Sequence, residues 1–333
     1  RLGRLVPRLA ALLDVAEDDV ATAARAAALA KSDLATAMVM DFTSLQGAMG
    51  QVYARLDGEP EAVATAIYEH YLPRGGGDAL PATRPGALLA LADRLDSLVG
   101  LFAVGLKPTG AQDPYGLRRA ALGIVRLLAE GELAIRDRRH GLPALVDAAA
   151  LELPVEATPA VRDELAAFLA TRCEVQLRDA GHPADVVAAV LARLAMAPRR
   201  AVDVVERLAR RVTEPASRAS LTSYARCKRI VRGQPHLDPV ARTEVAARLV
   251  EPVERALWAA VDAAGHRLEP DGYDDVDAVV DALRDLAPAI DAFFDGVLVM
   301  ADDPALRAAR LTVLHTIAAL PDAVADLSKL EGF

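Results

Sequence analysis

The sequence predicts an all-α protein with two helical domains. Hydrophobic residues make up 53% of the 333-residue chain and aromatic residues only 4%, so Ala, Leu and Val must fill the interior, as in closely packed helices. The second half of the chain shows none of the apolar and polar alternation of a strand. The length exceeds one compact helical domain and suits two. We therefore expect one domain over residues 1–150 and another over residues 151–333.

The first domain is expected to begin with short helices joined by turns. Residues Asp18–Val39 carry Leu and Val at helical intervals, and the next segment, Asp41–Glu59, interrupts this pattern with three glycines. Tyr71–Pro85 contains three consecutive glycines and three prolines, which predicts a loop between helices.

Two longer helices should complete this domain. The first begins near Gly86. The second has Asp113 at its N-cap, Pro114 at its first position and Gly131 just past its end. The prolines within Glu152–Pro159 then place the domain boundary near residue 150.

The second domain is predicted to be a series of capped helices, because Pro or Gly recurs at the ends of its apolar-periodic segments. No repeat of fixed period is visible, which argues against a solenoid. The expected helices span roughly residues 159–180, 184–196, 199–212, 217–232, 238–264, 273–300 and 304–330.

Composition excludes several classes of function. The net charge of −9 argues against binding nucleic acid over the whole surface, so any such contact must be local. The glycines at Gly75–Gly77 lack the preceding strand and following Lys of a nucleotide-binding loop. Cys173 and Cys227 have no zinc-site or disulfide spacing, and no apolar run reaches the roughly 18 residues that cross a bilayer. We expect a cytoplasmic protein with no catalytic residue and no metal.

Two predicted helices concentrate positive charge. On the helix Ser217–Arg232, Tyr224, Lys228 and Arg232 are spaced four apart, and Arg226 and Arg229 three apart. Basic side chains beside an aromatic ring suit an RNA loop with an unstacked base, although such a face can also be merely solvated. The candidate RNA-binding residues, including three arginines of the earlier helix, are Arg118, Arg119, Arg126, Tyr224, Arg226, Lys228, Arg229 and Arg232.

The stretch LALADRLDSL contains Asp93 and Asp96 on one turn of a helix. It resembles the helix that carries the last aspartate ligand in HD-family phosphohydrolases. Those enzymes also need a His-Asp pair to hold the metal that activates water, and this sequence has no His-Asp dipeptide. We interpret His70, Asp93 and Asp96 as a structural remnant of such a site, with an HD-type metal-dependent phosphohydrolase as the alternative function.

Several blocks of the chain are similar to one family over nearly its whole length. PTG, DPYGLRRAALG and LADRLD in the first half, and DELAAFLATRCEVQLRDAGHPADVVAAVLA in the second, resemble the β-subunit of bacterial-type glycyl-tRNA synthetase. Two departures are visible, because the family's EFPELQG is DFTSLQG here and its KR-x-x-N stretch is CKRIVRG, from Cys227 to Gly233. The missing Asn leaves Lys228 and Arg229 as the matching positions.

The resemblance implies a C-terminal part of that subunit, with an HD-like domain followed by an anticodon-binding domain of the arginyl-tRNA synthetase type. It implies that glycine tRNA is held here, while ATP and Mg²⁺ are used by an α-subunit or a fused α part. The chain alone is then expected to bind no cofactor and to catalyse nothing. A non-catalytic helical scaffold whose basic faces are only solvated remains the other alternative.

Overall fold

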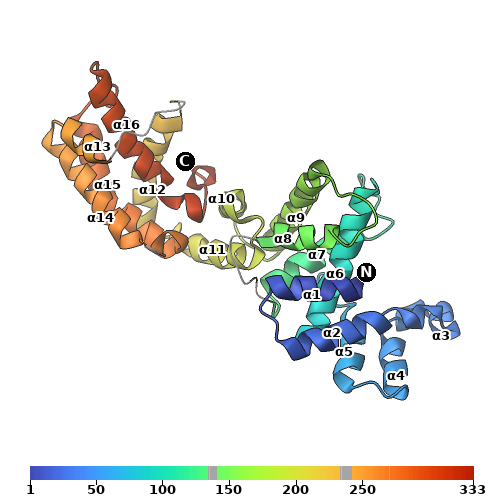
Figure 1. The fold of residues 1–333 in the computed structure, drawn as a ribbon. Coiled ribbons are helices and arrows are strands. Elements are labelled where there is room, and N and C mark those ends of the chain that lie inside the picture. The colour runs from blue at the N-terminus through green and yellow to red at the C-terminus, as the bar shows by residue number, and fades with distance from the viewer. Residues whose placement is uncertain (134, 136–140, 233, 235–241, 270) are drawn as a thin grey trace. The chain divides into compact units, whose positions relative to one another are not determined.

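The computed structural model describes residues 1–133, 135, 141–232, 234, 242–269 and 271–333. Within these ranges the ordered elements are helices and no strand is formed, which confirms the all-α prediction. The chain divides into two compact units (Figure 1). Unit 1 contains Arg1–Gln176 and Ala195–Arg200, and unit 2 contains Leu177–Leu194 and Ala201–Phe333. This division falls later in the chain than the boundary expected near residue 150.

Unit 1 is arranged around one buried helix, α6, which packs against α1, α2, α5, α7 and α8. Helix α6 is apolar on almost every side, and a helix of that kind is stable only when neighbours surround it. The elements of this unit are α1 (Leu2–Leu12), α2 (Glu17–Leu29), η1 (Ser32–Ala35), α3 (Ala37–Asp41), η2 (Thr43–Leu45), α4 (Ala48–Leu56), α5 (Glu61–Glu69), α6 (Arg84–Ala103), α7 (Leu117–Ala129), α8 (Gly141–Ala150) and most of α9 (Pro159–Asp179).

Helix α7 begins three residues later than the sequence indicated. Pro114 is not its first residue, because Gly116 has a left-handed backbone with φ of 65° and the helix starts at Leu117. Asp113 still caps it, accepting hydrogen bonds from the backbone N–H groups of Leu117 at 2.8 Å and Arg118 at 2.9 Å. A side chain four residues upstream therefore serves the amides that a helix start leaves without partners.

Unit 2 is built around α12, which packs against α15 and α16, while α15 also contacts α14. The expected helix over residues 238–264 lies partly outside the described residues, and its remainder is two helices separated before Pro252. The expected helix over 304–330 ends at Ala319. The elements of this part are α10 (Ala184–Leu194), α11 (Pro198–Arg211), α12 (Pro215–Arg232), α13 (Arg242–Arg248), α14 (Pro252–Leu268), η3 (Gly272–Asp274), α15 (Val276–Gly296), α16 (Pro304–Ala319), η4 (Leu320–Ala323) and η5 (Leu327–Lys329).

A buried ion pair joins α14 to α16. Glu254 is fully buried and accepts hydrogen bonds from the guanidinium of Arg310 and from the backbone N–H groups of Val250 and Glu251, at 2.6 and 2.7 Å. Arg310 also donates to the carbonyl of Leu298 at 2.5 Å. Because every charged group here has a partner, the cost of removing the pair from water is offset.

Candidate nucleic-acid interface

Tyr224 does not lie on the exposed face of α12. Its side chain is 0% exposed, and its hydroxyl donates to the carbonyl of Ala318 at 3.1 Å. The expectation that this ring stacks on an RNA base is therefore wrong, because a fully buried ring has no free face. Burial raises the pKa of the phenol far above its usual value, so Tyr224 remains a neutral hydrogen-bond donor.

Two of the predicted basic side chains of α12 are held by partners within unit 2. Lys228 donates to the carbonyl of Ala318 at 3.2 Å and lies 3.7 Å from the carboxylate of Asp322. Arg226 forms an ion pair with Asp291 at 3.3 Å, and its guanidinium carbon lies 4.3 Å from the centre of the Phe294 ring. Their charges are already partly compensated, so both residues primarily connect α12 to its neighbours.

The last turns of α12 carry the predicted arginines that face solvent. Arg229 and Arg232 are both exposed, and no carboxylate among the described residues pairs with either guanidinium. Nε of Arg229 donates to the carbonyl of Ala225, at 3.3 Å, within the same helix. Arg218, at the other end of α12, is exposed as well and was not singled out by the sequence. Within the described residues, these side chains are the arginines of α12 that face solvent without an acidic partner.

Helix α7 separates its three arginines. Arg119 is exposed and pairs with no carboxylate of the described chain. Arg118 is half-buried and donates to the carbonyl of Gly110 at 2.5 Å. Arg126 donates to the carbonyls of Gly75 and Asp78, at 3.3 and 3.1 Å, and so holds the glycine-rich loop. Of these three predicted RNA-binding residues, only Arg119 is therefore exposed without a hydrogen-bond partner or acidic partner among the described residues.

His70, Asp93 and Asp96 have different partners. His70 is buried, with Nδ1 2.5 Å from the carbonyl of Ile67 and Nε2 without a hydrogen-bond partner. Asp93 pairs with Lys31, and Asp96 accepts from two nitrogens of Arg1 at 2.8 and 2.9 Å. Burial lowers the pKa of His70, against an opposing effect of Asp93, so the imidazole is neutral near pH 7.

This cluster gives no support to the metal-dependent hydrolase. Among the described residues no group of three or more His, Cys, Asp or Glu side chains could hold a metal ion. Both carboxylates of the acidic helix are instead neutralised by a lysine and an arginine. Each of the three side chains thus contacts another residue of unit 1.

Arg94 organises this region, although no sequence pattern singled it out. Its buried guanidinium donates to the carbonyls of His70, Ala90 and Tyr71, each at 3.0 Å, and of Pro73 at 2.9 Å. Burial lowers its pKa to about 10, which leaves it charged at neutral pH. An arginine in a helix with no solvent-facing side is the signal that could have revealed it, because a buried charge must have partners.

Arg94 also fixes the approach of α7 to α6. A Cβ atom added at Gly123 would lie 2.5 Å from Nε of Arg94, closer than any real contact allows. Position 123 therefore faces the packed interface between the two helices.

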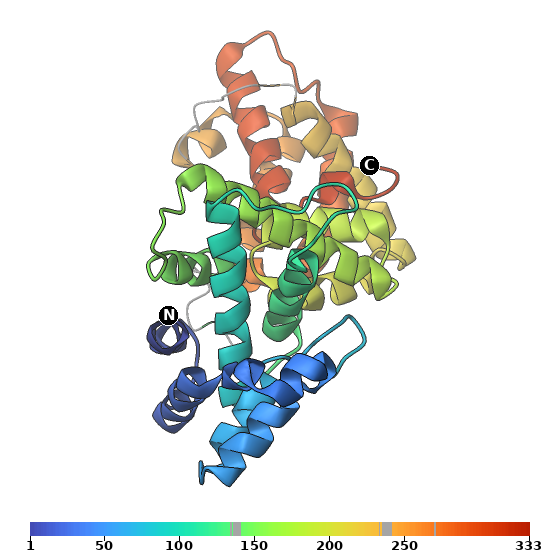
Figure 2. The same ribbon diagram turned by 90° about the vertical axis from the view of Figure 1, so that its right-hand side faces the viewer.

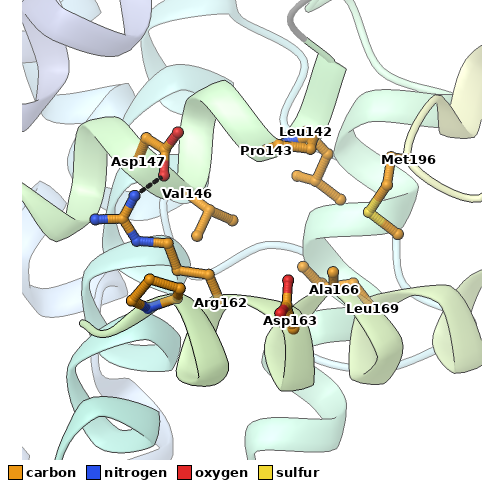
Figure 3. Close-up of a pocket in the computed structure, with 10 residues that line it drawn as sticks. Leu142, Pro143, Val146, Asp147, Arg162, Asp163, Ala166, Leu169 and Met196 are labelled. Atoms are coloured by element: carbon orange, nitrogen blue, oxygen red, sulfur yellow. Dashed lines mark hydrogen bonds and ion pairs between the residues drawn. The ribbon is translucent and has the colours of Figure 1, made fainter.

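A cavity of about 290 Å³ lies between α8 and α9 (Figure 3). Leu142 and Val146 of α8, Leu169 of α9 and Met196 form much of its apolar lining. At one side Arg162 forms an ion pair with Asp147 at 2.7 Å. The lining contains no histidine or cysteine, and its main arginine is already paired, so the cavity favours apolar contact over phosphate binding.

Comparison with known proteins identifies the family. A family model described as glycyl-tRNA synthetase beta subunit matches residues 1–192. The glycine–tRNA ligase beta subunits of Ralstonia nicotianae and Aromatoleum aromaticum are each 43% identical to this chain, over 99% and 100% of its length. That of Myxococcus xanthus is 42% identical over 94%.

These relatives are subunits of an aminoacyl-tRNA ligase. The chain belongs to the glycyl-tRNA synthetase beta-subunit family. It spans about half the length of the curated relatives it matches, with 46% of the Ralstonia protein and 47% of the Aromatoleum protein covered. No helix in the described ranges is both long and apolar enough to cross a membrane.

Proposed function

We propose that this chain holds glycine tRNA for a glycyl-tRNA synthetase. The observation that carries the proposal is the exposed pair Arg229 and Arg232 on α12, with which no carboxylate of the described residues forms an ion pair. On a chain of net charge −9, such a local cluster attracts phosphate while the rest of the surface repels it. The family to which the chain belongs supports tRNA as the RNA that it binds.

In this proposal the chemistry takes place elsewhere in the enzyme. The α-subunit or a fused α part uses ATP and Mg²⁺ to attach glycine, and this chain contributes binding and orientation. Holding the tRNA in the right orientation toward the catalytic site lowers the entropic part of the reaction barrier. A subunit without catalytic residues can therefore still raise the rate. The HD-like part contacts the acceptor arm and the second domain contacts the anticodon.

The proposal is tested by fluorescence titration of the chain with glycine tRNA and with a non-cognate tRNA at several salt concentrations. The test variant combines Arg229→Ala with Arg232→Ala. We expect it to bind glycine tRNA more weakly and to lower the slope of log K against log salt by about one for each lost phosphate contact.

A matched control removes two other arginines of unit 2. Arg267 and Arg284 are exposed but are paired with Asp285 at 3.1 Å and Asp281 at 3.1 Å. Arg267→Ala combined with Arg284→Ala changes the net charge by the same amount and should leave the affinity and the salt slope nearly unchanged. Equal effects of the two double variants, or no binding of glycine tRNA by the unaltered chain, would favour the helical scaffold instead.

A further inference from the structure

The segment between α6 and α7, residues 104–116, is a short loop with its own internal hydrogen bonds. Figure 2 shows it passing over the ends of these two helices before α7 turns back beside α6. Thr109 and Gln112 exchange backbone hydrogen bonds of 3.1 and 2.8 Å. Arg118 of α7 reaches the carbonyl of Gly110, and Asp113 is held by two α7 amides. The loop is therefore ordered before any partner arrives.

The end of this loop exposes one aromatic ring, and the first turn of α7 exposes an arginine that pairs with no carboxylate of the described residues. Tyr115 is 55% exposed. Arg119 folds back over the residue that follows it, because a Cβ atom added at Gly116 would lie 3.0 Å from Nη2 of Arg119. The Arg119 guanidinium therefore lies close to the backbone of Gly116, one residue after the exposed Tyr115, and no carboxylate among the described residues pairs with it.

The local charge favours an anionic partner. Among the described residues, Arg118 is bound only to a carbonyl and Arg119 to no acidic group. The nearby Lys107 is compensated, since it pairs with Glu164. The first amides of α7 are occupied by Asp113, so an incoming anion must be bound by the arginine side chains.

We propose that Tyr115 stacks against one unpaired base of an RNA while Arg119 binds the adjacent phosphate. Every base offers a π-face, so a ring presented on a rigid loop binds a single-stranded nucleotide with little dependence on its identity. The inference rests on the proposed function that the chain binds RNA and adds a contact in unit 1. Helix α12 offers no exposed aromatic ring near its arginines, because Tyr224 is buried. Tyr115 and Arg119 provide an exposed ring and an exposed guanidinium at the start of α7.

The test uses a single-stranded oligoribonucleotide that contains 2-aminopurine, whose fluorescence falls when the base stacks. The full chain is compared with Tyr115→Ala, Tyr115→Phe and Arg119→Ala. We expect quenching with the unaltered chain and with Tyr115→Phe, which keeps the ring. Tyr115→Ala should bind about tenfold more weakly, the effect of losing one stacking ring, and Arg119→Ala should lower the salt slope by about one.

Arg84→Ala is the matched control for Arg119→Ala. Arg84 is also exposed and pairs with no carboxylate of the described residues, but it begins α6, whose 20 residues put the loop about 30 Å away. It should bind the oligomer like the unaltered chain. Thermal unfolding of each variant checks that the substitutions at these exposed positions have not altered the fold.

Three outcomes would overturn the inference. Tyr115→Ala could bind as well as the unaltered chain, Tyr115→Phe could bind as poorly as Tyr115→Ala, or a free mononucleotide could compete as well as the oligomer. If the oligomer assay fails while the α12 double variant still loses glycine tRNA, the proposed function stands without this site. If quenching depends on Tyr115 but glycine tRNA does not bind, the base site stands and the proposed function fails.

Discussion

The hydrogen bonds of the Arg94 guanidinium contribute to the free energy of unfolding. This guanidinium donates to four buried or half-buried carbonyls, and Arg94→Met would remove this donor from the carbonyls of His70, Tyr71 and Pro73, which lie outside the helix. We expect the variant to lose about 3 kcal/mol of unfolding free energy in urea titrations. Arg84→Met, at the exposed start of the same helix, should change it by less than about 0.5 kcal/mol. Similar losses in both variants would contradict this role of Arg94.

His70 predicts a pH dependence of stability. Burial lowers its pKa in the folded chain below the value of an unfolded histidine. Below about pH 6.5 the unfolded chain therefore binds a proton that the folded chain does not, and stability falls as the pH decreases, by up to about 1.4 kcal/mol per pH unit. The contribution is unchanged above pH 7, where both states are neutral.

The measurement is urea unfolding between pH 5 and pH 8 for the unaltered chain and for His70→Asn, whose amide can still donate to the carbonyl of Ile67. The variant should lose less stability on acidification. His266→Asn removes an exposed histidine and serves as the control. An unchanged pH dependence in His70→Asn would show that another group causes it.

The spacing showed which residues of α12 lie on one face of the helix. It could not show which part of that face is buried by a neighbouring helix. Spacing alone treats Tyr224 and Arg232 alike, since they belong to one line. Only the packing of α16 against α12 distinguishes them, because it buries the tyrosine and leaves the last turn free. The same limit explains why Tyr115, in a loop without periodicity, escaped notice.

At the scale of elements, the C-terminal end of α16 depends on α12. The hydroxyl of Tyr224 and the ammonium of Lys228 both donate to the carbonyl of Ala318, in the last turn where helix carbonyls lack partners. Tyr224→Phe should therefore destabilise the chain by about 1 kcal/mol in urea unfolding and leave its affinity for glycine tRNA unchanged. A loss of affinity with unchanged stability would mean that the hydroxyl contacts RNA.

Helix existence was predictable here, and helix ends were less so. The apolar pattern of α6 and the residues Thr83 and Pro85 at its start make the helix evident from sequence. The start of α7 was misplaced because Asp113 caps from outside the helix, across a glycine with positive φ. A capping side chain fixes which amides are satisfied, and sequence does not show how far back it reaches.

At the scale of the whole molecule, the two compact units should respond separately to damage. Arg94 lies in unit 1, and the Glu254–Arg310 pair lies in unit 2. We expect Glu254→Gln, which leaves Arg310 buried without its counter-ion, to lower the unfolding temperature of one calorimetric transition by several degrees, and Arg94→Met to lower the other. A single transition shifted by both changes would show that the units unfold together.

The contact between Arg94 and Gly123 also limits which substitutions these two positions can tolerate. A side chain at Gly123 requires a shorter residue at 94, and a shorter residue at 94 abandons four carbonyls. Replacing either residue alone should therefore destabilise unit 1, so we expect the two positions to change together among related sequences. The LADRLD and DPYGLRRAALG blocks, which look like two separate signatures along the chain, are then the two halves of one inherited contact.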